Sequence, residues 1–238
     1  MLAALATAGV AATLAAGGYA YAAMWPTSQI FGRAIIGGPN PNEFALTYDD
    51  GPNDPYTQQL LDILARNNVR ATFFLIGRFV RQRPDIVRAI RAAGHLVGNH
   101  TTTHPVLLFK SPKRVHEELF GCNAAIEDAL GEPVRYFRPP HGARRPDVLR
   151  AARDLGLTPV LWNAMGYDWK PMTPEQVLTN LQKGIRHNQQ RGAGSNLLLH
   201  DGGQAGIGQD RSHSVAATAR LLESTRNSIQ YVTVNEWN

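Results

Sequence analysis

The sequence predicts an α/β fold in which a largely parallel sheet is closed, or nearly closed, into a barrel. Seven short apolar runs typical of strands alternate with helical stretches over about 190 residues, which is the pattern of parallel sheets. The strands are expected at residues 44–48, 72–76, 95–98, 135–138, 159–163, 196–199 and 231–234. The helices are expected at residues 57–67, 80–93, 112–130, 145–155, 174–191 and 212–227. Gly94 and Gly156 follow two of these helices, where a left-handed cap is expected.

Length and composition exclude several classes of protein. A chain of 238 residues fits one large domain, and 43% hydrophobic with 18% charged residues excludes global disorder and a coiled coil. The single cysteine, Cys122, excludes an intramolecular disulfide and a Cys-x-x-Cys zinc site, so any metal must be held by His, Asp or Glu. The net charge of +5 favours anionic surroundings, but no dense basic run is interleaved with aromatic residues. We therefore expect no nucleic-acid partner.

The N-terminal segment is apolar and uncharged. No charged side chain occurs from Met1 to Gly32, and the 24 residues from Leu2 to Trp25 are long enough as a helix to cross a hydrocarbon core of roughly 30 Å. The Ala20-Tyr21-Ala22 sequence also fits signal-peptidase cleavage. Residues 1–25 are thus predicted to be a signal peptide or a membrane anchor, with a buried Ala-rich core helix as the alternative. Residues 26–42, rich in Gly and Pro, are interpreted as a linker, and residues 43–238 as the folded domain of an exported, cell-envelope protein.

Two adjacent carboxylates follow the first predicted strand. Asp49 and Asp50 come directly after residues 44–48 and precede Gly51 and Pro52. In a parallel α/β barrel the loops at the carboxyl ends of the strands converge, and Gly51 permits unusual dihedral angles that turn both carboxylates toward one pocket. The alternative is an ordinary Asp-Gly-Pro turn with solvated acids.

Histidine, arginine and proline residues follow the next strands. His100 and His104 are spaced so that they can lie on one side of a helical turn and bind a divalent ion. Arg138 is followed by Pro139 and Pro140, and a fixed guanidinium beside rigid backbone suits a carboxylate or oxyanion site. A plain proline-rich corner is the alternative reading.

Two further motifs lie at later strand ends. Asp168 and Trp169 follow the strand expected at 159–163, and His200 ends the very apolar run Leu197-Leu198-Leu199. A lone histidine at such a place is usually structural, but here it accompanies four other polar strand ends.

Together and in this order, the five motifs resemble those of the polysaccharide deacetylase family, also called the NodB-homology domain or carbohydrate esterase family 4. The resemblance spans roughly Glu43 to Glu236, including the closing segments around residues 210–212 and 231–234. It implies a distorted (β/α)7 barrel, preceded here by the N-terminal hydrophobic segment, and a metal-dependent hydrolase that removes N-acetyl, sometimes O-acetyl, groups from sugars.

The resemblance assigns an expected role to each motif residue. The metal ligands would be Asp50, His100 and His104. The catalytic residues would be Asp49 as general base, His200 as general acid, Arg138 orienting the base and Asp168 tuning the acid. The substrate pocket would be lined by Pro140, His141, Trp169 and Leu198, with the backbone N–H of His141 as an oxyanion donor.

These residue types suit amide hydrolysis, which needs an activated water, a base for its proton and an acid for the leaving amine. The chain departs from the family pattern at His141, where an aromatic residue is usual, and at Tyr48, where phenylalanine is frequent. We expect the first change to affect substrate contacts and the second to be neutral.

Three functional hypotheses follow. The first is a metal-dependent deacetylase of glycans that contain N-acetylhexosamine, such as peptidoglycan or a chitin-like polymer, with zinc as the expected cofactor. The second is a deformylase or deacetylase of a lipid-linked sugar, and the third is a catalytically silent carbohydrate-binding barrel. The expected partners are a glycan substrate and, if the N-terminal segment is not cleaved, a membrane; the chain is expected to be a monomer.

Overall fold

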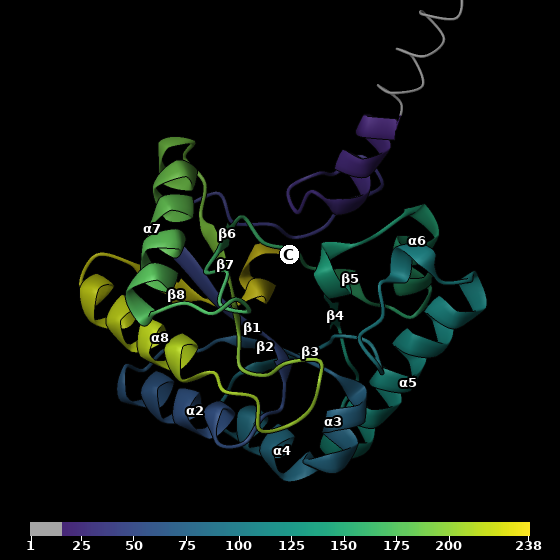
Figure 1. Cartoon of the computed structure of the whole chain (residues 1–238), viewed down its shortest axis with the longest axis horizontal. Coiled ribbons are helices and arrows are strands. Elements are labelled where there is room, and N and C mark those ends of the chain that lie inside the picture. The colour runs from purple at the N-terminus through teal and green to yellow at the C-terminus, as the bar shows by residue number, and fades with distance from the viewer. Residues whose placement is uncertain (1–15) are drawn as a thin grey trace, which may run out of the picture.

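A curled parallel sheet surrounded by helices forms the body of the molecule (Figure 1). The structure, a computed structural model, describes residues 16–238. Within them the strands are β1 (Glu43–Gly51), β2 (Thr72–Leu75), β3 (Leu96–Asn99), β4 (Tyr136–Phe137), β5 (Thr158–Pro159), β6 (Ala164–Met165), β7 (Ser195–His200) and β8 (Gln230–Val232). The helices are α2 (Tyr56–Arg66), α3 (Gly77–Gln82), α4 (Pro84–Ala92), α5 (Pro112–Leu130), α6 (Pro146–Asp154), α7 (Pro174–Gln190) and α8 (Ser212–Thr225).

The strand order confirms the predicted distorted (β/α)7 barrel. The sheet runs β5-β4-β3-β2-β1-β7-β6, and every pair in it is parallel. Strand β8 pairs with the first residues of β1, from Glu43 to Ala45. Because all strands run the same way, their carboxyl ends meet at one rim, where the loops can assemble a site.

Alternate residues of strand β1 belong to two different apolar layers. In β1, Leu46 and Tyr48 belong to the large core under the helices, whereas Ala45 packs with Phe74 inside the curled sheet. Since alternate residues of a strand point to opposite faces, Thr47 and Asp49 share the inner face with Ala45. The hydrophobic pattern of β1 therefore places the carboxylate of Asp49 inside the barrel.

Most predicted elements occur with bounds shifted by one or two residues. The first strand, expected at 44–48, runs on to Gly51 and so contains Asp49 and Asp50, and three further elements differ. The helix expected at 80–93 is two helices, α3 and α4, because Pro84 cannot continue a helix and Arg83 takes an extended φ of −133°. The strand expected at 159–163 is β5 followed by a separate β6. The strand expected at 231–234 ends at Val232, and a 3-10 turn occupies Val234–Trp237.

The N-terminal residues that the structure describes pack on the barrel. Residues 16–24 are mostly exposed and helical, and Arg144 fixes their end by donating from its backbone N to Ala23 O (3.0 Å) and from Nη2 to Trp25 O (2.8 Å). Within residues 26–42, Ile35 forms a parallel bridge with Val160, beside β5. The predicted signal peptide or anchor falls largely on residues 1–15, outside the described residues. From residue 16 onward, no helix is long and apolar enough to span a bilayer.

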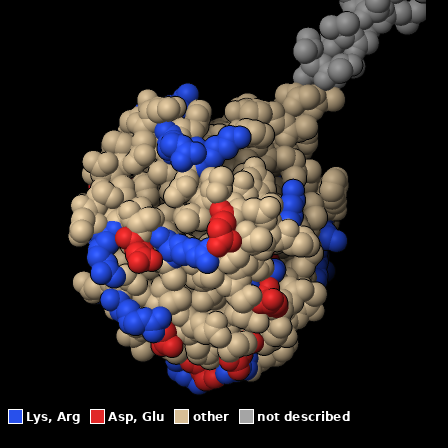
Figure 2. All heavy atoms as spheres, turned by 60° about the vertical axis from the view of Figure 1, so that its left-hand side comes forward, with Lys and Arg blue, Asp and Glu red and all other residues tan. Residues whose placement is uncertain are grey.

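The molecular surface in Figure 2 carries interspersed charges. This view brings forward the side of Figure 1 that holds α7 and α8, and blue Lys and Arg side chains alternate there with red Asp and Glu side chains. A continuous basic band is not seen on this face.

Candidate active site

The end of β1 turns two adjacent carboxylates into the barrel mouth. Asp49 keeps the inward direction of its strand, and Asp50 takes a left-handed φ of 74° at an irregularity in the pairing with β2. The unusual dihedral angle was predicted for Gly51, but Asp50 adopts it. Gly51 is needed for space instead, because a Cβ there would lie 2.3 Å from Asp201 Oδ2.

His100 and His104 lie on the loop that follows β3. The loop is not the predicted helical turn: Thr101 (φ 67°) and His104 (φ 61°) are both left-handed. His104 Nε2 lies 3.1 Å and His100 Nε2 lies 3.4 Å from Asp50 Oδ1. The spacing of two histidines four residues apart thus brings both imidazoles to one carboxylate, although by a different backbone path.

A buried glutamate fastens this loop to α5. The Glu118 carboxylate accepts hydrogen bonds from Thr103 N (2.8 Å) and Thr103 Oγ1 (2.6 Å), and Glu118 O accepts one from Thr102 N (3.0 Å). Arg114 Nη2 donates to the same carboxylate at 2.6 Å. The strained left-handed residues are therefore held from behind by a charged side chain that is itself 1% exposed.

The three groups fit a metal ion. The Nδ1 atoms of both histidines donate to oxygen acceptors, Arg138 O for His100 and Gln204 Oε1 for His104, each at 2.8 Å. This leaves the Nε2 lone pairs facing Asp50 Oδ1, a buried oxygen that meets the geometric criteria for a hydrogen bond with no group in residues 16–238. The ligand atoms of Asp50, His100 and His104 all lie within 4.8 Å of one another. Three converging lone pairs with fixed tautomers suit a cation bound at about 2.0–2.2 Å.

The pKa values of Asp50 and His104 shift in the directions expected when a proton, rather than a metal ion, lies between the two side chains. Burial acts to raise the pKa of Asp50, but hydrogen bonds and charge from His100 and His104 outweigh it and hold the pKa well below its usual value. Burial acts to lower the pKa of His104, and the hydrogen bond and charge of Asp50 raise it above its usual value. Positive charge is thus favoured between the imidazoles and the carboxylate.

Asp49 is held by a buried arginine. Arg138 is fully buried, and its Nη1 donates to Asp49 Oδ1 and to Thr47 Oγ1, both at 2.8 Å. The guanidinium lies 4.2 Å from the centre of the Phe74 ring. Burial lowers the pKa of Arg138 below its usual value, and the charge of Asp49 opposes that shift. Asp49 Oδ2 remains directed at the metal site, 3.6 Å from His100 Nε2.

His200 and Asp168 form a second buried pair across the mouth. His200 Nδ1 donates to Asp168 Oδ1 at 2.8 Å, and Asp168 Oδ2 accepts from His200 N (2.8 Å) and Ser214 Oγ (2.6 Å). Burial acts to lower the pKa of His200, but the charge and hydrogen bond of Asp168 outweigh it and raise the pKa to about 9. The imidazolium form is therefore favoured at neutral pH.

The remaining predicted residues lie around these groups. The His141 ring is edge-on to His104 with centroids 4.7 Å apart, and its φ of 59° is left-handed. The half-exposed Trp169 ring is edge-on to His200 at 5.5 Å. Pro140 is buried beside His141, and Leu198 packs in an inner apolar cluster with Leu161 and Trp162. Every residue of the predicted site thus lies at the mouth or directly beneath it.

Several supporting residues were not predicted. They are Thr47, Glu118, Gln204, Ser214, the fully buried Asp201, and His213, whose Nε2 donates to Asp168 O at 2.6 Å. Burial raises the pKa of Asp201 to about 7 although Thr57 Oγ1 donates to it at 2.5 Å. Glu118 and Ser214 stand at helix positions where the periodicity predicts apolar core residues. A polar residue at such a position is the sequence signal for a supporting role.

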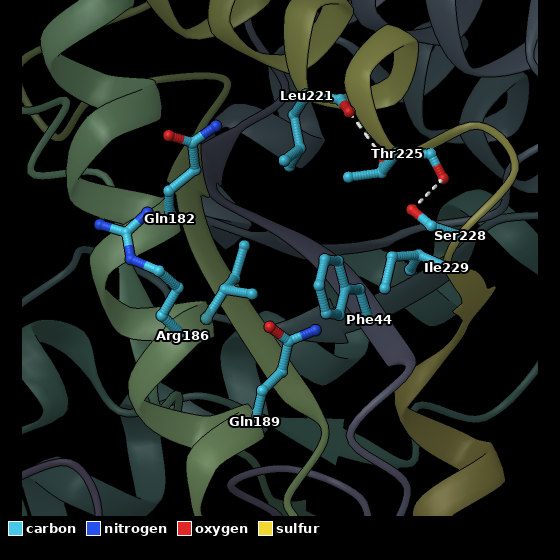
Figure 3. Close-up of a pocket in the computed structure, with 9 residues that line it drawn as sticks. Phe44, Gln182, Arg186, Gln189, Leu221, Thr225, Ser228 and Ile229 are labelled. Carbon is cyan, nitrogen blue, oxygen red and sulfur yellow. Dashed lines mark hydrogen bonds between the residues drawn. The ribbon is translucent and has the colours of Figure 1, made fainter.

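A surface hollow of about 260 Å³ lies elsewhere, between α7 and α8 (Figure 3). Phe44, at the start of β1, lines it, so it lies at the opposite end of the strand from Asp49. Its other lining residues are Gln182, Ile185, Arg186, Gln189, Leu221, Thr225, Ser228 and Ile229. Without a carboxylate or imidazole, it offers none of the groups that hydrolysis needs.

Comparison with known proteins agrees with this geometry. Residues 37–160 match the family model described as polysaccharide deacetylase. A chitooligosaccharide deacetylase of Bradyrhizobium sp. (strain ANU 289) is 36% identical over 188 residues, covering 79% of this chain and 81% of that protein. The crystal structure of a peptidoglycan N-acetylglucosamine deacetylase, bound to an N-oxidanyl-benzamide, is 29% identical with a TM-score of 0.77, covering 86% of this chain and 91% of the other.

A third similar structure is described as a pseudoenzyme. This carbohydrate esterase family 4 protein from Bacillus anthracis is 28% identical with a TM-score of 0.76, covering 86% of this chain and 68% of the other. The fold, with its candidate metal triad at the barrel mouth, is that of metal-dependent hydrolases that act on carbohydrates. The chain belongs to the polysaccharide deacetylase family, which confirms the resemblance seen in its motifs.

Proposed function

We propose that the protein is a metal-dependent hydrolase that removes N-acetyl groups from glycans containing N-acetylhexosamine, of the peptidoglycan or chitin type. The proposal rests on the position of one candidate metal triad, formed by Asp50, His100 and His104. The triad lies between two buried ion pairs, Arg138–Asp49 and His200–Asp168. One pair presents a carboxylate and the other an imidazole, the base and the acid of amide hydrolysis.

A divalent cation bound by the triad would lower the pKa of a water molecule and polarise the acetyl carbonyl. Two imidazoles and one carboxylate with an open side are a ligand set that zinc accepts, so zinc is the proposed metal. Gln204 and the backbone of Arg138 hold the imidazoles in the tautomer that can ligate it.

Asp49 is the proposed general base. Arg138 donates to its Oδ1, which orients the carboxylate, and Oδ2 is left to take a proton from the attacking water. His200 is the proposed general acid. Asp168 accepts a hydrogen bond from its Nδ1–H, so the Nε2–H is left to protonate the nitrogen of the departing amino sugar.

Substrate contacts are proposed for the residues around the triad. The backbone N–H of His141 donates to the developing oxyanion. Trp169, Leu198 and Pro140 enclose the acetyl methyl, and the His141 side chain alters substrate contacts relative to the usual aromatic residue. The partner is a glycan, and the chain acts as a monomer in the cell envelope after export by residues 1–25, either cleaved or retained as an anchor.

Two alternatives make different forecasts. A lipid-linked sugar deacylase would act on detergent-solubilised lipid-sugar but not on soluble oligomers, and the apolar N-terminal segment favours it. A catalytically silent barrel would lack a ligand, the base or the acid. All five of Asp49, Asp50, His100, His104 and His200 are present, which favours an active enzyme.

The test is release of acetate from peptidoglycan, chitooligosaccharides and acetylxylan, with and without a chelator. We expect release from at least one N-acetylated substrate, loss of release with chelator and recovery with zinc. Release that is unaffected by chelator, or none from any of the substrates by a folded, zinc-loaded protein, contradicts the proposal.

A further inference from the structure

The ligand histidine His104 is oriented by a side chain from a distant loop. Gln204 lies in the loop between β7 and α8, and its Oε1 accepts the hydrogen bond from His104 Nδ1 at 2.8 Å. On the other side of the same ring, Nε2 lies 3.1 Å from Asp50 Oδ1. The imidazole is therefore held between an amide from β7–α8 and a carboxylate from β1.

The second ligand histidine has a different support. His100 Nδ1 donates to the main-chain oxygen of Arg138 at 2.8 Å, an acceptor that the fold itself provides. Of the two acceptors, only Gln204 Oε1, which accepts from His104, belongs to a side chain. Substitution can thus remove the support of one ligand while leaving the other untouched.

The loop that carries Gln204 is anchored independently of this contact. Asn53 is buried, and its Nδ2 donates to Asp201 O (2.8 Å) and Gln209 O (2.9 Å), while its Oδ1 accepts from Gly208 N (2.6 Å). Arg78 Nη2 donates to the backbone oxygen of Gln204. The Gln204 side chain is largely exposed, and in residues 16–238 its single hydrogen bond is the one to His104.

We propose that Gln204 is a positioning residue of the metal site, which fixes the Nδ1–H tautomer and ring orientation of His104 and so couples metal affinity to the order of the β7–α8 loop. The inference rests on the proposed metal site. An acceptor on the far nitrogen of a ligating histidine typically contributes 10- to 100-fold in affinity, about the effect expected here. Coupling is reciprocal, so bound metal should stabilise the Gln204–His104 contact by the same factor.

The test compares zinc dissociation constants, measured by competition with a chromophoric chelator, for the full chain and three variants. Gln204→Leu keeps the bulk but removes the acceptor, and we expect its Kd to rise by about 10- to 100-fold. Gln204→Glu supplies a stronger, charged acceptor and should bind zinc at least as tightly as the wild type. Gln209→Leu is the matched control in the same loop, because within residues 16–238 the Gln209 side chain makes no hydrogen bond to His104, and its Kd should not change.

A second readout follows the loop itself. Hydrogen exchange of the amides of residues 203–208 should slow on zinc addition in the wild type and in Gln209→Leu, and much less in Gln204→Leu. Equal melting temperatures of the metal-free proteins would show that the variants are folded.

Three results would overturn the inference. They are a Kd of Gln204→Leu within twofold of the wild type, an equal loss in Gln209→Leu, or weaker binding in Gln204→Glu than in Gln204→Leu. In each of these the wild type still binds one zinc ion and the proposed function stands. A folded wild type that binds no zinc contradicts the proposed function itself, and this inference with it.

Discussion

Arg138 Nη1 lies 2.8 Å from Asp49 Oδ1, and both side chains are almost completely withdrawn from water. An ion pair at this depth is stable only while both partners are present, because a single charge left there has no solvent to stabilise it. The pair therefore links catalysis to folding: the group proposed to take the proton is also part of the core.

Replacing Arg138 by Met should leave the Asp49 carboxylate buried without its partner. We expect the free energy of unfolding to fall by about 3–5 kcal/mol, and the double variant Arg138→Met/Asp49→Asn to recover part of it. Urea unfolding of the wild type, both single variants and the double variant measures the coupling. Additive losses in the double variant would show that the two side chains do not stabilise one another.

The raised pKa of His200 sets an expectation for rate against pH. Since a general acid must be protonated, kcat/KM should fall as pH rises through about 9, the pKa of His200. In Asp168→Asn the charge that raises this pKa is gone, so the alkaline limb should move down by about two pH units or more. Profiles of both proteins on one N-acetylated substrate measure the shift. An alkaline limb that does not move in Asp168→Asn, or a wild-type kcat/KM that stays level up to about pH 11, would remove the acid role from His200.

The same pair should make stability depend on pH. The pKa of His200 is higher in the folded protein, about 9, than the ordinary value of about 6.5. Its stabilisation is therefore fully present below about pH 6.5 and is lost as pH rises through about 9. The difference in unfolding free energy between the wild type and His200→Gln should be larger at pH 6 than at pH 9.5. A difference that grows with pH is incompatible with this sign.

Glu118 should support metal binding from a distance. Glu118→Ala removes the acceptor of Thr103 N and Oγ1, and we expect a loss of about 1–3 kcal/mol in stability with weaker zinc binding. Glu117→Ala, at the exposed neighbouring position, is the control and should change neither. Calorimetric melting and zinc titration of both variants decide the matter. Equal effects of the two substitutions would mean that α5 as a whole, rather than the Glu118 carboxylate, holds the loop.

The sequence predicted where the strands end, but not the paths of the loops that connect them. The apolar run before Asp49 and the run before His200 predict strands, and in a parallel barrel their carboxyl ends must meet. That reasoning places Asp49 and His200 at one rim. The structure confirms this, because Asp49 and His200 are direct partners in the parallel pairing of β1 with β7. The paths between strands follow less regular rules. The left-handed turns at Thr101 and His104 replace the expected helical turn because Glu118, on α5, supplies the hydrogen bonds that such a turn needs.

Supporting contacts were beyond local patterns for a similar reason. Gln204 lies 100 residues from His104, in a loop without hydrophobic periodicity. Ser214, the third residue of α8, donates to Asp168, and its polarity at a buried position of the helix does not name that partner. Only the fold brings these pairs together, so sequence spacing could name the ligands and the catalytic groups but not what orients them.

The central claim is a division of labour between the two histidine sites, and zinc content tests it most directly. His104→Ala removes a proposed ligand, whereas His200→Ala removes only a proposed proton donor. Zinc stoichiometry of the folded variants should fall well below one in His104→Ala and remain near one in His200→Ala, whose turnover should nevertheless drop by roughly 10²- to 10⁴-fold. Asp49→Asn should behave like His200→Ala. Full zinc content in His104→Ala, or loss of zinc from His200→Ala, would contradict the account.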